Sequence, residues 1–319
     1  MYALRIYMLV LILNQILAQI IIANYTKNCT YDNHPKAPEV YYINLKKSHR
    51  RRQVIQQLLS TMQLRYFRVE AVTSSCVYVP HDLVRPLHNS ALSFADVCKY
   101  WTKEKIDNST QAMQVTNKTH LVSGICSIGL LWTELYCTMS HLLAIYNAVH
   151  STTAKSNYAI IMEDDIHIPI STDFNALAES APSDFGILQL LSVNAYRVSD
   201  LWQSYAREHT LWSKHTDALF WSTGIYIINR ERIRPIIDAI VHVDPAYPHI
   251  MQYTLIATKP RYRKYKLPPE CTGKATTSKP SICIQSHDIV ADRYIYAMST
   301  TYMSSLSIAY VQTGFKTTV

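Results

Sequence analysis

The stretch Tyr158–Asp165, YAIIMEDD, decides the fold predicted for this chain. A short, continuous apolar run is typical of a strand buried on both faces, as in a parallel sheet covered by helices. Three acids follow the run directly. Ligands of open α/β sheets bind beyond the carboxyl ends of the strands, so these acids are expected at a binding edge.

Carboxylates at such an edge favour a hard divalent cation. Burial and mutual repulsion make three adjacent acids costly unless positive charge offsets them, and oxygen ligands suit Mn²⁺ or Mg²⁺. Side chains alternate along a strand, so Glu163 and Asp165 are expected to point one way and Asp164 the other. We assign Asp165 and Glu163 to metal binding, and Glu163 and Asp164 to donor binding. The alternative is an acidic turn that caps the next element.

The same pattern of strands alternating with helices extends along most of the chain. It predicts an α/β protein with a mainly parallel central sheet. The expected strands are residues 40–45, 64–72, 158–162, 186–191 and 224–228, and the expected helices are 48–62, 133–150 and 231–241.

Composition narrows the class of protein. Hydrophobic residues make up 48% of the 319 residues and charged residues 17%, which excludes a wholly disordered or collagen-like chain. Only 6 glycines are present, so a glycine-rich phosphate loop is not expected. Seven cysteines include no Cys-x-x-Cys pair, which gives no support for a zinc ribbon. The net charge of +8 suits an anionic ligand or surface.

The amino terminus predicts a secretory address. Arg5 precedes an apolar stretch over residues 6–22, the layout of a signal peptide or signal anchor at 1–23. We therefore expect the lumen of the endoplasmic reticulum or Golgi, or secretion, with membrane contact only through this segment if it is uncleaved. The same address argues against a nucleic-acid partner. Four sequons agree with it, and their glycosylation sites would be Asn24, Asn28, Asn108 and Asn117.

The domain prediction follows from these patterns. A lumenal linker at 24–37 leads into one domain at 38–305, and residues 306–319 form a tail. Within that domain, residues 73–125 read as a divergent insertion and 259–281 as a basic loop.

A second candidate site follows the first strand. Asn44 ends that strand, and Arg51 and Arg52 lie in the following basic helix. Arginine forks match phosphate oxygens, so we assign these three residues to donor binding. The alternative is a solvated basic helix face.

A third feature is Glu134, Ser140 and His141 on one predicted helix. His141 is either a catalytic base or a hydrogen-bonded core residue. No Gly-x-Ser-x-Gly is present, which argues against a serine hydrolase.

Taken in order, these segments resemble glycosyltransferase family 25, the lipooligosaccharide and procollagen galactosyltransferases. The matching stretches are VYYINLKKSHRRRQVIQQL (40–58), FRVEAV (67–72), ELYCTMSH (134–141), AIIMEDDIHI (159–168), DFGILQL (184–190), STGIYIINRERIRPII (222–237) and VAD (290–292). Tyr136 stands where the family usually has glycine. The resemblance covers roughly residues 38–300, apart from 73–125 and 245–285.

The resemblance implies a GT-A-like nucleotide-sugar-binding fold and an inverting, metal-dependent transfer of a hexose. The donor implied is a UDP-sugar, most of all UDP-galactose, and the acceptor is a protein or glycan hydroxyl. An inverting transfer needs a general base, for which Asp292, Asp217 and His141 all remain candidates. The alternative function is a non-catalytic, secreted glycan-binding or adhesion protein that retains the fold.

Overall fold

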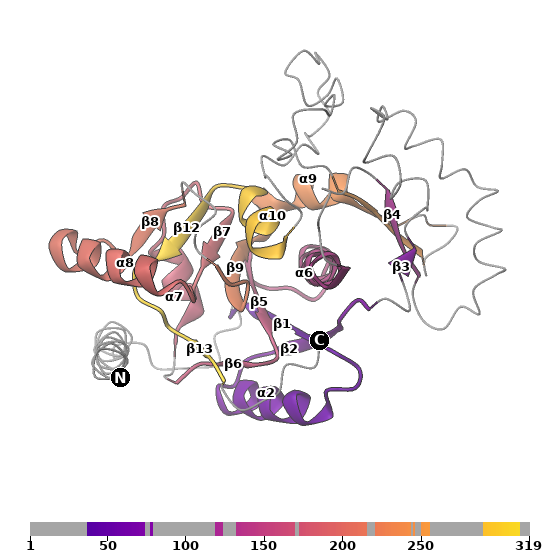
Figure 1. Ribbon diagram of the computed structural model, residues 1–319, viewed down its shortest axis with the longest axis horizontal. Coiled ribbons are helices and arrows are strands. Elements are labelled where there is room, and N and C mark those ends of the chain that lie inside the picture. Colours follow the sequence, from indigo (N-terminus) through magenta and orange to yellow (C-terminus); the bar gives the residue numbers. More distant parts are fainter. Residues whose placement is uncertain are drawn as a thin grey trace, which may run out of the picture. The chain divides into compact units, whose positions relative to one another are not determined.

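The computed structural model describes residues 37–73, 77–78, 119–123, 132–169, 172–215, 221–243, 245, 250–255 and 290–312 (Figure 1). The chain divides into two compact units. The first takes in Met1–Val69, Asn147–Glu231 and Ser299–Val319, and the second takes in Glu70–Tyr146 and Arg232–Met298. Among the described helices, none has both the length and the apolar character needed to cross a membrane. The predicted segment 1–23 lies outside the described residues, as does the predicted linker at 24–37 apart from its last residue.

A seven-stranded sheet organises the first unit. Its strands, in spatial order, are β2 (Tyr66–Glu70), β1 (Glu39–Asn44), β5 (Tyr158–Glu163), β9 (Ile225–Asn229), β7 (Ile187–Gln189), β12 (Thr301–Ser304) and β8 (Trp212–Lys214). β1 pairs in parallel with β5, and β7 with β12, while β9 runs antiparallel to both β5 and β7. Four strands, β1, β5, β7 and β12, therefore share one direction. The predicted α/β class with its central sheet is confirmed.

The central strands are buried on both faces, as their apolar runs predict. On one face, alternate residues of β1, β5, β7 and β9 join a single core cluster, which includes Val40, Tyr42, Ile160, Met162, Leu188, Ile225 and Ile227. The residues between them are also buried, for example Tyr41, Ile161 and Tyr226. This double burial explains why these strands contain almost no polar residues until their ends.

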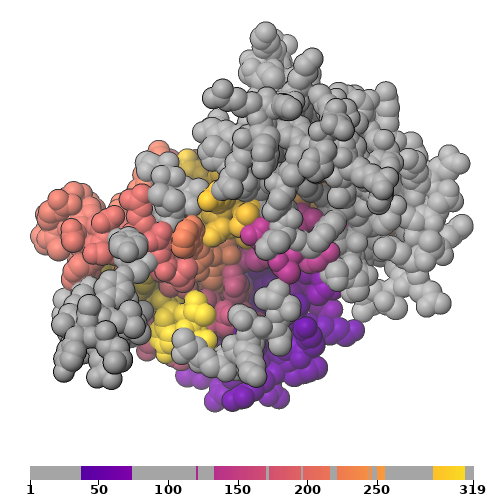
Figure 2. All heavy atoms as spheres, in the orientation of Figure 1, coloured from indigo at the N-terminus to yellow at the C-terminus, as the bar shows by residue number. Residues whose placement is uncertain are grey.

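Helices and their caps complete the first unit. α2 (His49–Thr61) buries only Ile55 and Leu59, and Figure 2 shows atoms of this part of the chain in indigo at the molecular surface. α7 (Phe174–Glu179) begins where the Asp173 side chain accepts two backbone N–H bonds. α8 (Ala195–Glu208) begins after Asn194, which caps it in the same way through one bond. Such caps satisfy donors that the first helical turn leaves open.

A small two-stranded sheet follows the acidic end of β5. β6 (Ile166–His167) pairs antiparallel with β13 (Tyr310–Val311). A segment close to the carboxyl terminus thus lies against the residues that follow Glu163-Asp164-Asp165, and it has a direct contact with that site.

The second unit holds a separate four-stranded sheet, in the order β10 (Val241–Val243), β11 (Ile250–Thr254), β4 (Thr119–Ser123) and β3 (Val77–Tyr78). Its helices are α10 (Ala291–Ala297) and most of α6 (Trp132–Val149) and α9 (Arg230–Ile240). The division into one domain at 38–305 with a tail at 306–319 stays a prediction. Most of 73–125 and all of 259–281 lie outside the described residues.

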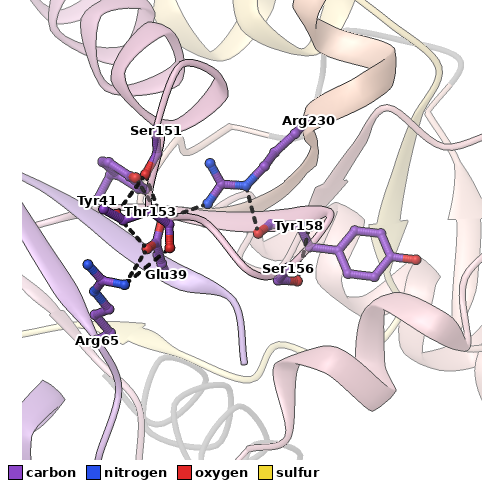
Figure 3. Close-up of polar contacts among 8 residues, drawn as sticks. All are labelled: Glu39, Tyr41, Arg65, Ser151, Thr153, Ser156, Tyr158 and Arg230. Carbon is purple, nitrogen blue, oxygen red and sulfur yellow. Dashed lines mark hydrogen bonds and ion pairs between the residues drawn. The ribbon is translucent and has the colours of Figure 1, made fainter. Parts of the chain in front are cut away.

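A buried ion pair lies at the amino ends of β1 and β5, away from the acidic edge (Figure 3). Arg230 donates through Nη2 to Glu39 at 3.0 Å and through Nε to the Tyr158 carbonyl at 3.1 Å. The hydroxyls of Tyr41 and Ser151 also donate to Glu39. Glu39 is 2% exposed, so its charge depends on these partners.

Candidate active site

Three segments meet at the carboxyl edge of the large sheet. β1 and β5 are parallel and in register, with Ile43 opposite Glu163, so Asn44 and the acids end at the same edge. β9 is antiparallel and begins there. The Glu163 N–H donates to the Gly224 carbonyl just before β9, at 2.8 Å. Sheet topology therefore gathers residues that are far apart in sequence.

Asp164 is held from two sides. The Asn44 amide donates to its Oδ2 at 2.7 Å, and Arg51 Nη1 donates to its Oδ1 at 3.1 Å. Asn44 is itself oriented by Arg68, whose Nε donates to its Oδ1 at 3.0 Å. Burial raises the pKa of Asp164, while its bonds to Asn44 and Arg51 act against that rise. Asn44, assigned above to donor binding, is 1% exposed and positions Asp164.

Asp165 contacts the same guanidinium group, that of Arg51. Arg51 Nη1 donates to Asp165 Oδ2 at 3.3 Å, and the Asp165 carbonyl accepts the Gln312 N–H at 2.7 Å. Burial raises the pKa of Asp165 to about 6, and the nearby charges of Glu163 and Asp164 add to the effect while Arg51 opposes it. Arg51 thus pairs with two of the three carboxylates, and the charges of Glu163 and Asp164 act on Asp165 as well.

The expected alternation of the acids is wrong. β5 ends at Glu163, and Asp164 and Asp165 form a turn before β6. The period of two that holds in a strand does not apply in a turn. Asp164 and Asp165 consequently converge on Arg51 instead of pointing to opposite faces.

Glu163 is oriented from the strand on its other side. The Thr223 hydroxyl donates to Glu163 Oε1 at 2.9 Å. The segment that holds Thr223 is fixed in turn by Gln189, whose buried amide donates to the carbonyls of Ser222 and Leu191. Sequence reasoning assigned no role to Thr223 or Gln189, although both lie in motifs that carried the family resemblance.

The predicted arginines separate in the structure. Arg51 reaches the acids, whereas Arg52 donates to His49 of its own helix. Of the described residues, Arg51 alone makes ion pairs with Asp164 and Asp165. The solvated-face alternative thus fits Arg52 better than Arg51.

The general-base candidates belong to other parts of the chain. His141 is 1% exposed on α6, and Asp292 is half-buried in the first turn of α10, both in the second unit. Ser140, next to His141, accepts the Val72 N–H at 2.9 Å and donates to the Tyr136 carbonyl, so it has a structural role. Asp217 and the sequon residues Asn24, Asn28, Asn108 and Asn117 lie outside the described residues.

The mostly parallel sheet with flanking helices is consistent with a GT-A-like fold, the fold of many enzymes that bind nucleotide-sugars. The acids and Arg51 lie at the carboxyl edge of its strands β1 and β5. The chain belongs to glycosyltransferase family 25. The model of that family, described as "Glycosyltransferase family 25 (LPS biosynthesis protein)", matches residues 37–248, which is more than half of the chain. A comparison with curated proteins finds no match.

Membership in this family indicates the general function of the chain. The chain is a glycosyltransferase, and the family implies a nucleotide-sugar donor and a glycan acceptor. The matched range contains Asn44, Arg51, the three acids and Gly224, so it includes the whole carboxyl-edge site except Gln312.

Proposed function

We propose that this chain is a metal-dependent, inverting hexosyltransferase that moves galactose from UDP-galactose to a protein or glycan hydroxyl in the secretory pathway. The observation that carries this proposal is the cluster of three carboxylates at the end of β5. Arg51 pairs with two of them, Asp164 and Asp165, and the pKa of Asp165 is raised to about 6 by burial and by the charges of Glu163 and Asp164. A site of this kind is stabilised by a divalent cation.

The residues fit Mn²⁺ or Mg²⁺. Asp165 and Glu163 supply hard oxygen ligands, whereas Asp164 is already held by Asn44 and Arg51. Within the described ranges, no three His, Cys, Asp or Glu side chains form a cage that could hold a metal. Magnesium sites of enzymes often use one or two carboxylates and take further ligands from substrate phosphates and water. Asp165 and Glu163 match that pattern.

The residues of the chain then have distinct roles. A bound divalent cation would supply positive charge that stabilises the departing UDP. Arg51 would donate to the diphosphate oxygens, for which its planar fork is suited. Asn44 would keep Asp164, and through it Arg51, in place. Thr223 would orient the Glu163 carboxylate.

A base must remove the proton of the acceptor hydroxyl. Of our three candidates, we place Asp292 before His141 because His141 has only 1% of its surface exposed, and a base must reach its substrate. An Asp292→Asn variant that binds donor normally and transfers normally would remove Asp292 from this role.

The test is donor cleavage by the chain made in a secretory host. UDP-galactose, UDP-glucose, UDP-N-acetylglucosamine and GDP-mannose are each supplied with manganese or with a chelator, and release of the nucleotide is measured. We expect slow, manganese-dependent release of UDP from UDP-galactose. Asp165→Ala should abolish it, whereas Asp200→Ala, an exposed aspartate on α8, should leave it unchanged.

Two results would overturn the proposal. Release that persists in the chelator and in Asp165→Ala would remove the metal site. Binding of glycans without release from any donor would favour the non-catalytic glycan-binding function.

A further inference from the structure

The segment just before β9 is unusually well held for a loop. The Trp221 carbonyl accepts the Val193 N–H at 3.0 Å, and the Ser222 carbonyl accepts the buried Gln189 amide at 3.0 Å. Thr223 then donates to Glu163. Ser222 and Thr223 are thus bonded to strand residues of the large sheet, and Trp221 is bonded to the segment that follows β7.

The backbone of this segment is also strained. Ser222 has a φ of 115°, a region that residues with a side chain rarely adopt. Its hydroxyl accepts the Gly224 N–H at 3.1 Å, which helps to hold that conformation. A Cβ at Gly224 would lie 2.6 Å from Ile166 Cδ1, so a side chain there would force Ile166 to shift. Strain that the surroundings maintain is concentrated at functional sites.

The same strained segment exposes the indole of Trp221 to solvent. Trp221 is 48% exposed, and Val193, which is bonded to it through the backbone, is 52% exposed. Large apolar residues with such exposure are few among the described residues, and the others are Tyr310 and Val311 on β13. Nearly half of Trp221 thus faces solvent, although its backbone is fixed.

The place of Trp221 links it to the site. It lies two residues before Thr223, so the two Cα atoms are at most about 7 Å apart. Thr223 in turn contacts the acid at the end of β5. The backbone that carries the indole is thus fixed close to the residue that contacts Glu163.

We propose that Trp221 and Val193 form a platform that binds a pyranose ring. The face of an indole is electron-rich and apolar, and it suits the C–H face of a sugar, whose hydrogens carry a small positive charge. An aromatic side chain has only two χ angles to fix, so on a backbone that is already held it loses little entropy on binding. This inference rests on the proposed function for its substrate class, and it adds a specificity residue outside the acids and arginines.

Two substrates carry a pyranose ring that fits this platform: the donor, through its hexose, and the acceptor, through one of its sugars. The first arm of the test measures the dissociation constants of UDP and UDP-galactose with manganese. The second arm measures saturation transfer from the protein to the methyl glycosides of galactose, glucose and N-acetylglucosamine.

The variants are Trp221→Ala, Trp221→Phe and a matched pair of valine substitutions. If the donor hexose lies on the platform, Trp221→Ala should weaken UDP-galactose by about 5–10-fold and leave UDP unchanged. If an acceptor sugar lies on the platform, Trp221→Ala should keep the affinity for UDP-galactose and lose the saturation transfer to the methyl glycosides. Trp221→Phe should restore most of the loss. Val193→Ala should weaken the same ligand, and Val311→Ala, equally conservative but on β13, should not.

The outcomes separate the platform from the proposed function. If Trp221→Ala changes neither arm in a protein that binds UDP-galactose, the platform is wrong and the proposed function stands. If the wild-type chain binds no nucleotide but loses glycoside binding in Trp221→Ala, the proposed function is wrong and the platform stands.

Discussion

Asp165→Asn should make the metal-free protein more stable at neutral pH. The ordinary pKa of an aspartate in this scale is 3.8, and burial with its acidic neighbours raises that of Asp165 to about 6. The folded state therefore disfavours the ionised side chain. An asparagine keeps the shape of the side chain and removes its charge.

The size of the gain follows from the pKa. At about 1.4 kcal/mol per pKa unit, the step from 3.8 to about 6 corresponds to roughly 3 kcal/mol. This shift already includes the opposing effect of the Arg51 charge, so that contact requires no further deduction. We expect an increase of about 3 kcal/mol in the free energy of unfolding.

The dependence on pH has a definite sign. Between pH 3.8 and about 6, the folded state of the wild type binds more protons at this residue than the unfolded state does. The contribution of Asp165 to the free energy of unfolding therefore falls as pH rises through that window. The gain in Asp165→Asn should be present at pH 7.5 and absent near pH 4.

Urea unfolding in a chelator at the two pH values measures the effect. Asp200→Asn, whose side chain is 64% exposed, serves as the control and should change little. Added Mn²⁺ should stabilise the wild type and not Asp165→Asn. An Asp165→Asn variant that is less stable than the wild type at pH 7.5 would refute the reasoning.

Three further variants test other parts of the first unit. Gly224→Ala places a Cβ 2.6 Å from a core side chain and should cost about 1–3 kcal/mol, measured by urea unfolding; a neutral result would show that the loop adjusts. Glu39→Gln leaves the buried Arg230 without its counter-charge and should lower the free energy of unfolding by about 3 kcal/mol. Arg65→Ala removes a side chain that is 51% exposed and should lower it by under about 1 kcal/mol. Equal losses of stability in the two variants would contradict this. Gln312→Pro removes the N–H that binds the Asp165 carbonyl and should weaken Mn²⁺ binding in calorimetry, while Gln312→Ala keeps that N–H and should not. Equal manganese affinity in both Gln312 variants would count against the backbone contact.

Much of the fold could be predicted from local pattern. Strand β5 and helix α2 appear within one residue of their predicted limits, because apolar runs and helical periods are local properties. Helix α8 was not predicted, although both signals are in the sequence. Val198, Leu201, Trp202 and Tyr205 recur at helical spacing, and Asn194 caps the start of the helix.

The sequence indicated which acids belong to the candidate site, but it gave less of the geometry of the site. The directions of Asp164 and Asp165 depend on where β5 ends, and because the strand ends at Glu163 these two residues lie in a turn, where the alternation of a strand does not hold. Thr223 reaches Glu163 only because β9 runs antiparallel, a fact of topology that single residues do not carry. Gln312 contacts Asp165 from the far end of the chain, and nothing in its neighbourhood indicated this.

The pairing of β13 with β6 has a consequence for biosynthesis. Gln312 contacts His167 across 145 positions, and its N–H completes the bonding of the turn that contains Asp165. A growing chain makes β1, α2 and β5 early, yet this turn stays without its last partner until residue 312 has been synthesised. The candidate site is therefore among the last parts to be completed, and a message truncated after codon 309 would yield a chain with most of the large sheet but without the contact from Gln312 to the Asp165 turn.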